Sequence, residues 1–347
     1  MRIRLIISTL LIVLFFPCYS FAETTLTSTS TFDTRPAVQA FIQNMVKKYG
    51  FNKDQLTQLF SAVKVRPKVI RSIKAPLEQR PWHTYQRLFV TEGRIRNGVT
   101  FWDTYQTILT AVEKKYGVPA SIIVATIGIE TKYGEHTGEY PVIDALTNIG
   151  FSDSPRAPYF RSELEEFLLL TREQHLDPLT VMGSYAGAIG QPQFMPSSYR
   201  RYAVNFDGSH PIDLSHNEGD IIASIANFYK QKGWETNQLI TVPASLIGNN
   251  YQFYLNKNKE IKIIKRTTLA EFGLPTDSIK KEKQPYKLLI LQSNWGNEYW
   301  LTFHNFDVIK RYNASDLYAM SVFQLSHYLE VLRTELNKKL NQESNHA

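Results

Sequence analysis

The sequence predicts a mainly α-helical protein that carries a small β-rich insertion. Apolar residues recur at helical spacing along most of the chain, and residues 120–133 are apolar on nearly every side. Residues 239–306 contain runs of β-branched and aromatic residues, and 261–264 and 287–291 have the composition of strands. The apolar share of 43% in 347 residues is ordinary for a globular protein.

Apolar periodicity sets the order of the helices. The first is expected to begin near Pro36 and to end at Tyr49, where Gly50 can adopt the left-handed conformation of a cap. Further helices are expected at 54–63, 69–73, 99–116, 120–133, 161–174, 220–232 and 315–336. We divide the chain into a helical N-terminal part (36–98), a core (99–238), the β-rich insertion (239–306) and a helical C-terminal part (307–347).

Residues 1–22 have the features of a secretory signal peptide. Arg2 and Arg4 give a positive start, residues 5–16 are mostly apolar, and Ser20 and Ala22 place small side chains where a signal peptidase reads them. The apolar run is shorter than the ~20 residues that a membrane-spanning helix needs. We therefore expect export and cleavage after Ala22, with residues 23–35 as a flexible lead-in.

Cys18 leaves an alternative open, because a lipoprotein is cleaved directly before a cysteine that then carries the lipid. In that case the protein would be anchored in the outer membrane. The preceding residue is Pro17, whereas a lipoprotein signal prefers a small residue at that position. If Cys18 is removed with the signal, the mature chain has no cysteine, and a packed core must hold it without disulfides.

The formal net charge of +7 indicates an anionic partner. A basic exported protein suits an anionic polymer such as the bacterial cell wall. Nucleic acid is the other anionic polymer, and export argues against it.

Glu130 is the strongest candidate for a catalytic acid. The apolar residues 122–129 precede it and Gly134 follows as a cap, so it lies near the end of a buried helix. Desolvation at that place would favour the neutral carboxyl and raise its pKa, as a general acid requires. The alternative is a solvated side chain paired with Lys132 or Lys115.

Residues 183–196 form a second unusual stretch, rich in glycine, alanine and proline. Such a composition lets the backbone approach a ligand closely. Gln193 can donate and accept hydrogen bonds, as a sugar or an acetamide group requires. The alternative is a tightly packed loop without a ligand.

The two stretches together resemble the lytic murein transglycosylase B family. The matching motifs are ETKYG at 130–134, GAIGQPQFMPSSY at 187–199 and RYNASDLYAM at 311–320. The resemblance extends from about Phe41 to Tyr328, which is nearly the whole mature chain. Three motifs in the same order make the resemblance specific.

This resemblance implies a fold and an activity. The fold is a lysozyme-like catalytic core, whose groove the helical C-terminal part completes. The activity is cleavage of the β-1,4 bond between N-acetylmuramic acid and N-acetylglucosamine in peptidoglycan, with a 1,6-anhydro product made without water. The expected location is the periplasm. We expect peptidoglycan glycan strands and other cell-wall enzymes as partners, no nucleic acid, and a monomer.

The resemblance also assigns roles to residues. Glu130 matches the catalytic acid of the family. The positions that match its groove are Ser184, Gln193, Tyr312, Asn313, Tyr318, Tyr85 and Arg156. A further groove tyrosine of the family is replaced here by Phe228, whose ring can stack on a sugar without a hydroxyl contact.

Most glycosidases use two carboxylates, and a second one is not evident here. Asp144, Asp153 and Glu163 are candidates without a compelling motif, whereas a mechanism with a single acid needs none of them. Two alternatives remain open. A muramidase would hydrolyse the same bond with water, and a non-catalytic scaffold that binds peptidoglycan would lack the acid.

We expect the reaction to need no cofactor. The family often carries a Ca²⁺ loop after the second motif, and here Asn205, Asp207 and Ser209, with Asp220 beyond, are the candidate oxygen ligands. Only one of the first three is charged, and the loop is one residue longer than in the family. The alternative is an ordinary polar turn.

Overall fold

The structure is a computed structural model that describes residues 31–73, 80–208, 211–244 and 287–344. Several predictions concern residues outside these ranges: the signal peptide, Cys18, Ser209 and the strand at 261–264. In the described part of the chain, no helix has the length and apolar content needed to cross a membrane.

Helices dominate the described chain, which confirms the mainly α class. They are α1 (Pro36–Tyr49), α2 (Lys53–Ala62), α3 (Pro67–Ser72), α4 (Trp82–Phe89), α5 (Glu92–Thr104), α6 (Gln106–Tyr116), α7 (Ala120–Thr131), α8 (Val142–Gly150), α9 (Ala157–Glu173), α10 (Pro196–Tyr202), α11 (Glu218–Gln231), α13 (His304–Lys310) and α14 (Asp316–Ser344), with the short 3₁₀ turn η1 (Phe32–Thr34) before them. The strands are β1 (Tyr140–Pro141), β2 (Met182–Gly183), β3 (Thr241–Ala244), β4 (Lys287–Ser293) and β5 (Gly296–Thr302).

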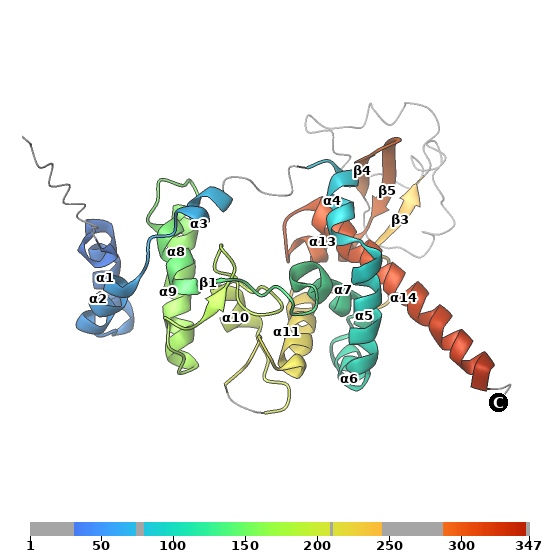
Figure 1. Ribbon diagram of the computed structural model, residues 1–347, viewed down its shortest axis with the longest axis horizontal. Coiled ribbons are helices and arrows are strands. Elements are labelled where there is room, and N and C mark those ends of the chain that lie inside the picture. Colours follow the sequence, from blue (N-terminus) through green and yellow to red (C-terminus); the bar gives the residue numbers. More distant parts are fainter. Residues whose placement is uncertain (1–30, 74–79, 209–210, 245–286, 345–347) are drawn as a thin grey trace, which may run out of the picture.

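The helices follow one another across the molecule as a series of packed neighbours (Figure 1). The N-terminal α3 packs on α8, α8 on α9, and α9 on α10, which contacts α11. Beyond these, α7 is packed among α5, α6, α11 and α14. The antiparallel sheet β3-β5-β4 lies at the same end of the molecule as α4 and α13, and β4 contacts α4.

Helix α7 lies at the centre of this packing. All its residues except Glu130 are buried, and Ile123, Val124, Ala125 and Ile127 have no exposed surface. A helix that is apolar on every side is stable in water only when other elements surround it completely. The residue that caps the end of the helix is Lys132, whose φ of 50° is in the left-handed region that usually favours glycine.

The side chain of Tyr133, the residue after this cap, connects the end of α7 to α5 by a hydrogen bond. Its hydroxyl donates a hydrogen bond of 2.9 Å to the carbonyl oxygen of Arg94. Glycine makes room for it on both helices, because a Cβ atom would lie 2.5 Å from the Tyr133 hydroxyl at Gly128 and 2.3 Å from it at Gly98. Burial raises the pKa of Tyr133, so its hydroxyl stays a neutral donor at physiological pH.

The predicted helix at 99–116 is wrong in its bounds. Two helices occupy this region: α5 begins earlier, at Glu92, and the chain breaks at Tyr105 before α6. The early start has a local cause, because the Thr91 hydroxyl accepts a hydrogen bond from the backbone N–H of Arg94 and so caps α5. The break is marked by backbone angles of −107° and 23° at Tyr105, outside the helical range.

We predict that Gly128→Ala destabilises the protein, because the added methyl group must displace the Tyr133 hydroxyl. The expected loss is about 1–3 kcal/mol in the free energy of unfolding, measured by urea denaturation. Gly93→Ala is the matched control, because it lies in α5 with nothing within 4 Å of the added carbon. Equal stability of the two variants would contradict the close packing of the Tyr133 hydroxyl against Gly128.

Candidate active site

The carboxyl group of Glu130 is held by a tyrosine from the opposite end of the sequence. Glu130 is half-buried in the last turn of α7. Tyr318, in the first turns of α14, donates a hydrogen bond of 2.7 Å from its hydroxyl to Oε1 of Glu130. Because Tyr318 is only 2% exposed, its side chain is fixed by packing and sets the position of the carboxyl group.

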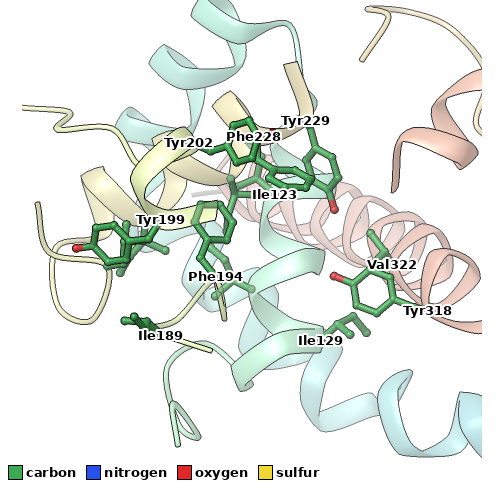
Figure 2. Packing of buried hydrophobic residues seen from close by; sticks show 14 of the residues in the cluster. Ile123, Ile129, Ile189, Phe194, Tyr199, Tyr202, Phe228, Tyr229, Tyr318 and Val322 are labelled. Atoms are coloured by element: carbon green, nitrogen blue, oxygen red, sulfur yellow. The ribbon is translucent and has the colours of Figure 1, made fainter. Parts of the chain in front are cut away.

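Two more tyrosines extend this cluster. Tyr229 from α11 shares a hydrogen bond of 2.9 Å with the Thr126 hydroxyl of α7, and Tyr312 donates one of 2.6 Å to the carbonyl oxygen of Pro192. The rings of Tyr312 and Tyr318 are nearly parallel, with centroids 6.2 Å apart. In Figure 2 the hydroxyl ends of Tyr229 and Tyr318 are turned toward the same region.

The three tyrosine hydroxyls have a common electrostatic setting. Burial raises the pKa of Tyr229, Tyr312 and Tyr318, and the nearby charge of Glu130 raises each pKa further. All three therefore remain neutral and can donate hydrogen bonds well above neutral pH. The result is an acid surrounded by polar groups that do not compete with it for a proton.

Phe228 does not have the role that its match to the family's groove implies. The residue is 4% exposed, and its ring packs against Tyr312 at 4.7 Å, Tyr202 at 5.0 Å and Phe194 at 5.7 Å between centroids. Figure 2 shows Phe194 and Tyr202 beside Phe228. Its ring has no open face for a sugar, so we correct its assignment to core packing. The adjacent Tyr229, which sequence reasoning did not single out, shares a hydrogen bond with Thr126, and the charge of Glu130 raises its pKa.

The glycine-rich stretch forms a tightly bonded loop next to α7. Ser184 lies at its start, and the Ser184 Oγ accepts hydrogen bonds from the backbone N–H groups of Ala186 and Ala188 at 3.2 and 3.1 Å. Gln193 has a left-handed φ of 51°, and its side-chain amide donates to the carbonyl oxygens of Thr137 and Gly190. Both side chains are half-buried and hold the shape of the loop.

The other residues matched to the groove differ in exposure. Tyr85 is 1% exposed and its ring contacts Phe89 at 4.6 Å, so it packs in the interior and has no open face toward a groove. Arg156 is exposed at the start of α9, with its guanidinium 5.1 Å from the ring centroid of Phe160. Asn313 is half-buried in the link between α13 and α14, directly after Tyr312.

The alternative carboxylates have structural partners elsewhere. Asp144 is 3% exposed and forms an ion pair of 2.8 Å with Arg66. Glu163 is 4% exposed and accepts hydrogen bonds from the backbone N–H and hydroxyl of Ser197, at the start of α10. Asp153 is exposed. In the part of the chain that the structure describes, none of the three belongs to the tyrosine cluster.

The described residues of the candidate Ca²⁺ loop do not fit a cation site. Asp220 is fully buried, and its two carboxylate oxygens accept hydrogen bonds from the backbone N–H groups of Phe206 and Asp213 at 2.8 and 3.0 Å. Each oxygen therefore already accepts one backbone donor, and these two bonds fix the carboxylate as an organiser of the loop. Asp207 is exposed and Asn205 half-buried, and no group of three or more His, Cys, Asp or Glu residues in the described ranges is arranged to hold a metal.

Comparisons with known proteins identify the family of the chain. The family model described as "Transglycosylase SLT domain" matches residues 33–327. The membrane-bound lytic murein transglycosylase B of Escherichia coli (strain K12) is 37% identical over 314 residues, which cover 88% of this chain and 85% of that protein.

Solved structures extend the similarity to the fold. The soluble lytic transglycosylase SltB1 of Pseudomonas aeruginosa is 40% identical with a TM-score of 0.79, over 86% of this chain and 100% of that one. The Escherichia coli lytic transglycosylase Slt35, solved in complex with calcium, is 37% identical with a TM-score of 0.77, over 87% and 95% of the two chains.

A more distant relative was solved with a ligand. SltB3 of Pseudomonas aeruginosa, in complex with NAG-NAM-pentapeptide, is 26% identical with a TM-score of 0.73, over 84% of this chain and 78% of that one. These similarities confirm the predicted lysozyme-like fold class. The chain belongs to the transglycosylase SLT family, and it is an enzyme of the lytic transglycosylase type.

Proposed function

We propose that the protein cleaves the β-1,4 bond between N-acetylmuramic acid and N-acetylglucosamine in peptidoglycan and releases a 1,6-anhydromuramoyl product. The observation that carries this proposal is the contact between Glu130 and Tyr318, which singles out one carboxyl group at the end of a buried helix. The relatives support the substrate, since SltB3 was solved with a muropeptide and the Escherichia coli relative is a murein transglycosylase.

A single carboxyl group suffices for this reaction. Glu130 protonates the glycosidic oxygen as the bond to the anomeric carbon of muramic acid breaks, and the N-acetyl group of that sugar stabilises the positive charge. The Glu130 carboxylate then takes the proton from the muramoyl 6-hydroxyl, whose oxygen attacks the anomeric carbon and closes the anhydro ring. Glu130 ends the cycle protonated, and no water is consumed.

Tyr318 supports both stages of this cycle. Its hydroxyl bonds one carboxyl oxygen of Glu130, and its raised pKa keeps it a neutral donor throughout. A neutral donor stabilises the carboxylate that forms after the first proton transfer without adding a charge to the site. Tyr312 stacks on Tyr318 and so supports its orientation.

We also propose sugar contacts for the exposed and half-buried residues around this centre. Ser184, Gln193, Tyr312, Asn313 and Arg156 have surface from which to contact a glycan strand. Tyr85 would act from the interior, by packing beneath that surface. The monomeric state and the contacts with other cell-wall enzymes remain predictions.

For the location, we propose export to the periplasm with removal of residues 1–22. The N-terminal pattern supports export, and the relatives include one membrane-bound and one soluble protein. Attachment to the outer membrane through Cys18 is the alternative. Labelling of cells with a fatty acid distinguishes the two, because only the lipoprotein takes up the label.

Glu130→Gln is expected to remove the acid while keeping the shape of the side chain. We predict a fall in turnover of purified sacculi of about 10²–10⁴-fold, which is the usual contribution of general acid–base catalysis. Glu92→Gln is the control, because Glu92 is exposed on α5. Appreciable turnover by folded Glu130→Gln protein would refute the assignment of the acid.

Tyr318→Phe tests the support of the acid. Loss of a hydrogen bond to a charged group costs about 1.5–3 kcal/mol, so kcat should fall about 10- to 100-fold with little change in KM. Tyr328→Phe, at a position that is 43% exposed on α14, is the matched control. A Tyr318→Phe enzyme with unchanged kcat would show that this contact has no part in the reaction.

Calcium is expected to have no effect on this protein, because the Asp220 carboxylate organises the loop through backbone N–H groups. We predict that neither EDTA nor added CaCl₂ shifts the melting temperature. Asp220→Asn should lower the free energy of unfolding by about 1–3 kcal/mol, because a buried backbone donor loses its acceptor. A saturable rise of the melting temperature with CaCl₂, as in a protein with a calcium loop, would overturn this reading.

A further inference from the structure

A cavity of about 320 Å³ lies beside the end of α7 and takes no part in the chemistry proposed for Glu130. It is formed by the end of α4, the first turns of α5 and the residues that follow α7. The lining residues are Leu88, Thr91, Gly93, Arg94, Asn97, Lys132, Tyr133 and Glu135.

The cavity contains a buried positive charge. Arg94 is only 8% exposed, and its Nη1 donates hydrogen bonds of 2.7 and 2.6 Å to the carbonyl oxygens of Leu88 and Phe89. Its Nε is buried without a hydrogen-bond partner among the described residues, and none of their carboxylates forms an ion pair with it. Buried cations in proteins are normally paired, and the burial of Arg94 lowers its pKa.

Lys132 adds a second positive charge at the mouth of the cavity. Its Nζ lies 4.0 Å from Oε2 of Glu135, and the two side chains are 47% and 57% exposed. Such a long, solvated pair contributes little, so Glu135 neutralises Lys132 only weakly, although its charge also acts on Arg94. Two cations and one weakly paired carboxylate give the cavity a net positive charge, which suits a carboxylate ligand.

The cavity is also close to the acid. Lys132 follows Glu130 by two residues, so their Cα atoms are within about 7 Å of each other. Tyr133, which lines the cavity, also packs against Gly128 on the helix that carries Glu130. Two or three residues of an extended peptide, at about 3.3–3.6 Å per residue, span a distance of this size.

We propose that this cavity binds a carboxylate of the peptide that the muramic acid of the substrate carries, and that Arg94 and Lys132 recognise it. The inference rests on the proposed function, because it names a further part of the same substrate. A peptide-bearing strand would then bind more tightly than a bare glycan strand. The cavity thus gives the enzyme a preference for the peptide-substituted wall.

Binding measurements test this without turnover. In Glu130→Gln protein, calorimetry gives the Kd of a GlcNAc-MurNAc disaccharide with its pentapeptide and of the same disaccharide without peptide. Adding Lys132→Gln should lower the preference for the peptide form about fivefold, whereas Glu135→Gln should raise it about twofold. Lys338→Gln, which removes the same charge from an exposed part of α14, should leave the preference unchanged.

The outcomes separate the two proposals. If the preference is absent, or does not change in opposite directions in the two cavity variants, the peptide inference is wrong. Turnover of sacculi by the wild-type chain is measured separately. Its absence would overturn the proposed function, even where the binding preference follows the predicted pattern.

Discussion

The arrangement of Glu130 and its tyrosine partner depends on the burial of α7. Because this helix is apolar on every side, α5, α6, α11 and α14 must surround it, and together they fix its last turn. Glu130 is the residue at which this burial becomes partial. The same packing brings Tyr318 from α14, 188 residues away in the chain, within hydrogen-bond distance of its carboxyl group.

The other candidate carboxylates have structural roles, and this distinguishes Glu130 as the candidate for the catalytic acid. Asp144 pairs with Arg66, Glu163 caps the start of α10, and Asp220 binds the backbone of the loop after α10. Each of these groups accepts at least one backbone N–H that would otherwise lack this partner. The same reasoning makes Arg94 unusual, since its buried charge has no such carboxylate among the described residues.

The sequence was sufficient to predict the helical class and the place of Glu130, because both depend on local patterns. The long apolar run of α7 is visible in any window of the sequence, and so is Gly50 at the end of α1. The boundary of α5 was missed because a single hydroxyl, that of Thr91, sets it. The short helices α4, α8, α10 and α13 were not predicted.

Errors in the site arose where burial depends on distant parts of the chain. Nothing local indicates that Phe228 packs among Tyr312, Tyr202 and Phe194, or that the buried Tyr229 lies close enough to Glu130 for that charge to raise its pKa. Similarly, nothing local indicates that the Asp220 carboxylate accepts hydrogen bonds from two backbone N–H groups of the loop. Tertiary packing, rather than residue type, decides these roles.

The identity of the reaction product tests the central claim most directly. Purified sacculi are digested with the mature protein, and the released muropeptides are analysed by mass spectrometry. Attack by the muramoyl 6-hydroxyl predicts products that are lighter by one water than the corresponding hydrolysis products. Products with free reducing ends would show that water is the nucleophile, and would contradict the mechanism in which Glu130 alone serves as acid and base.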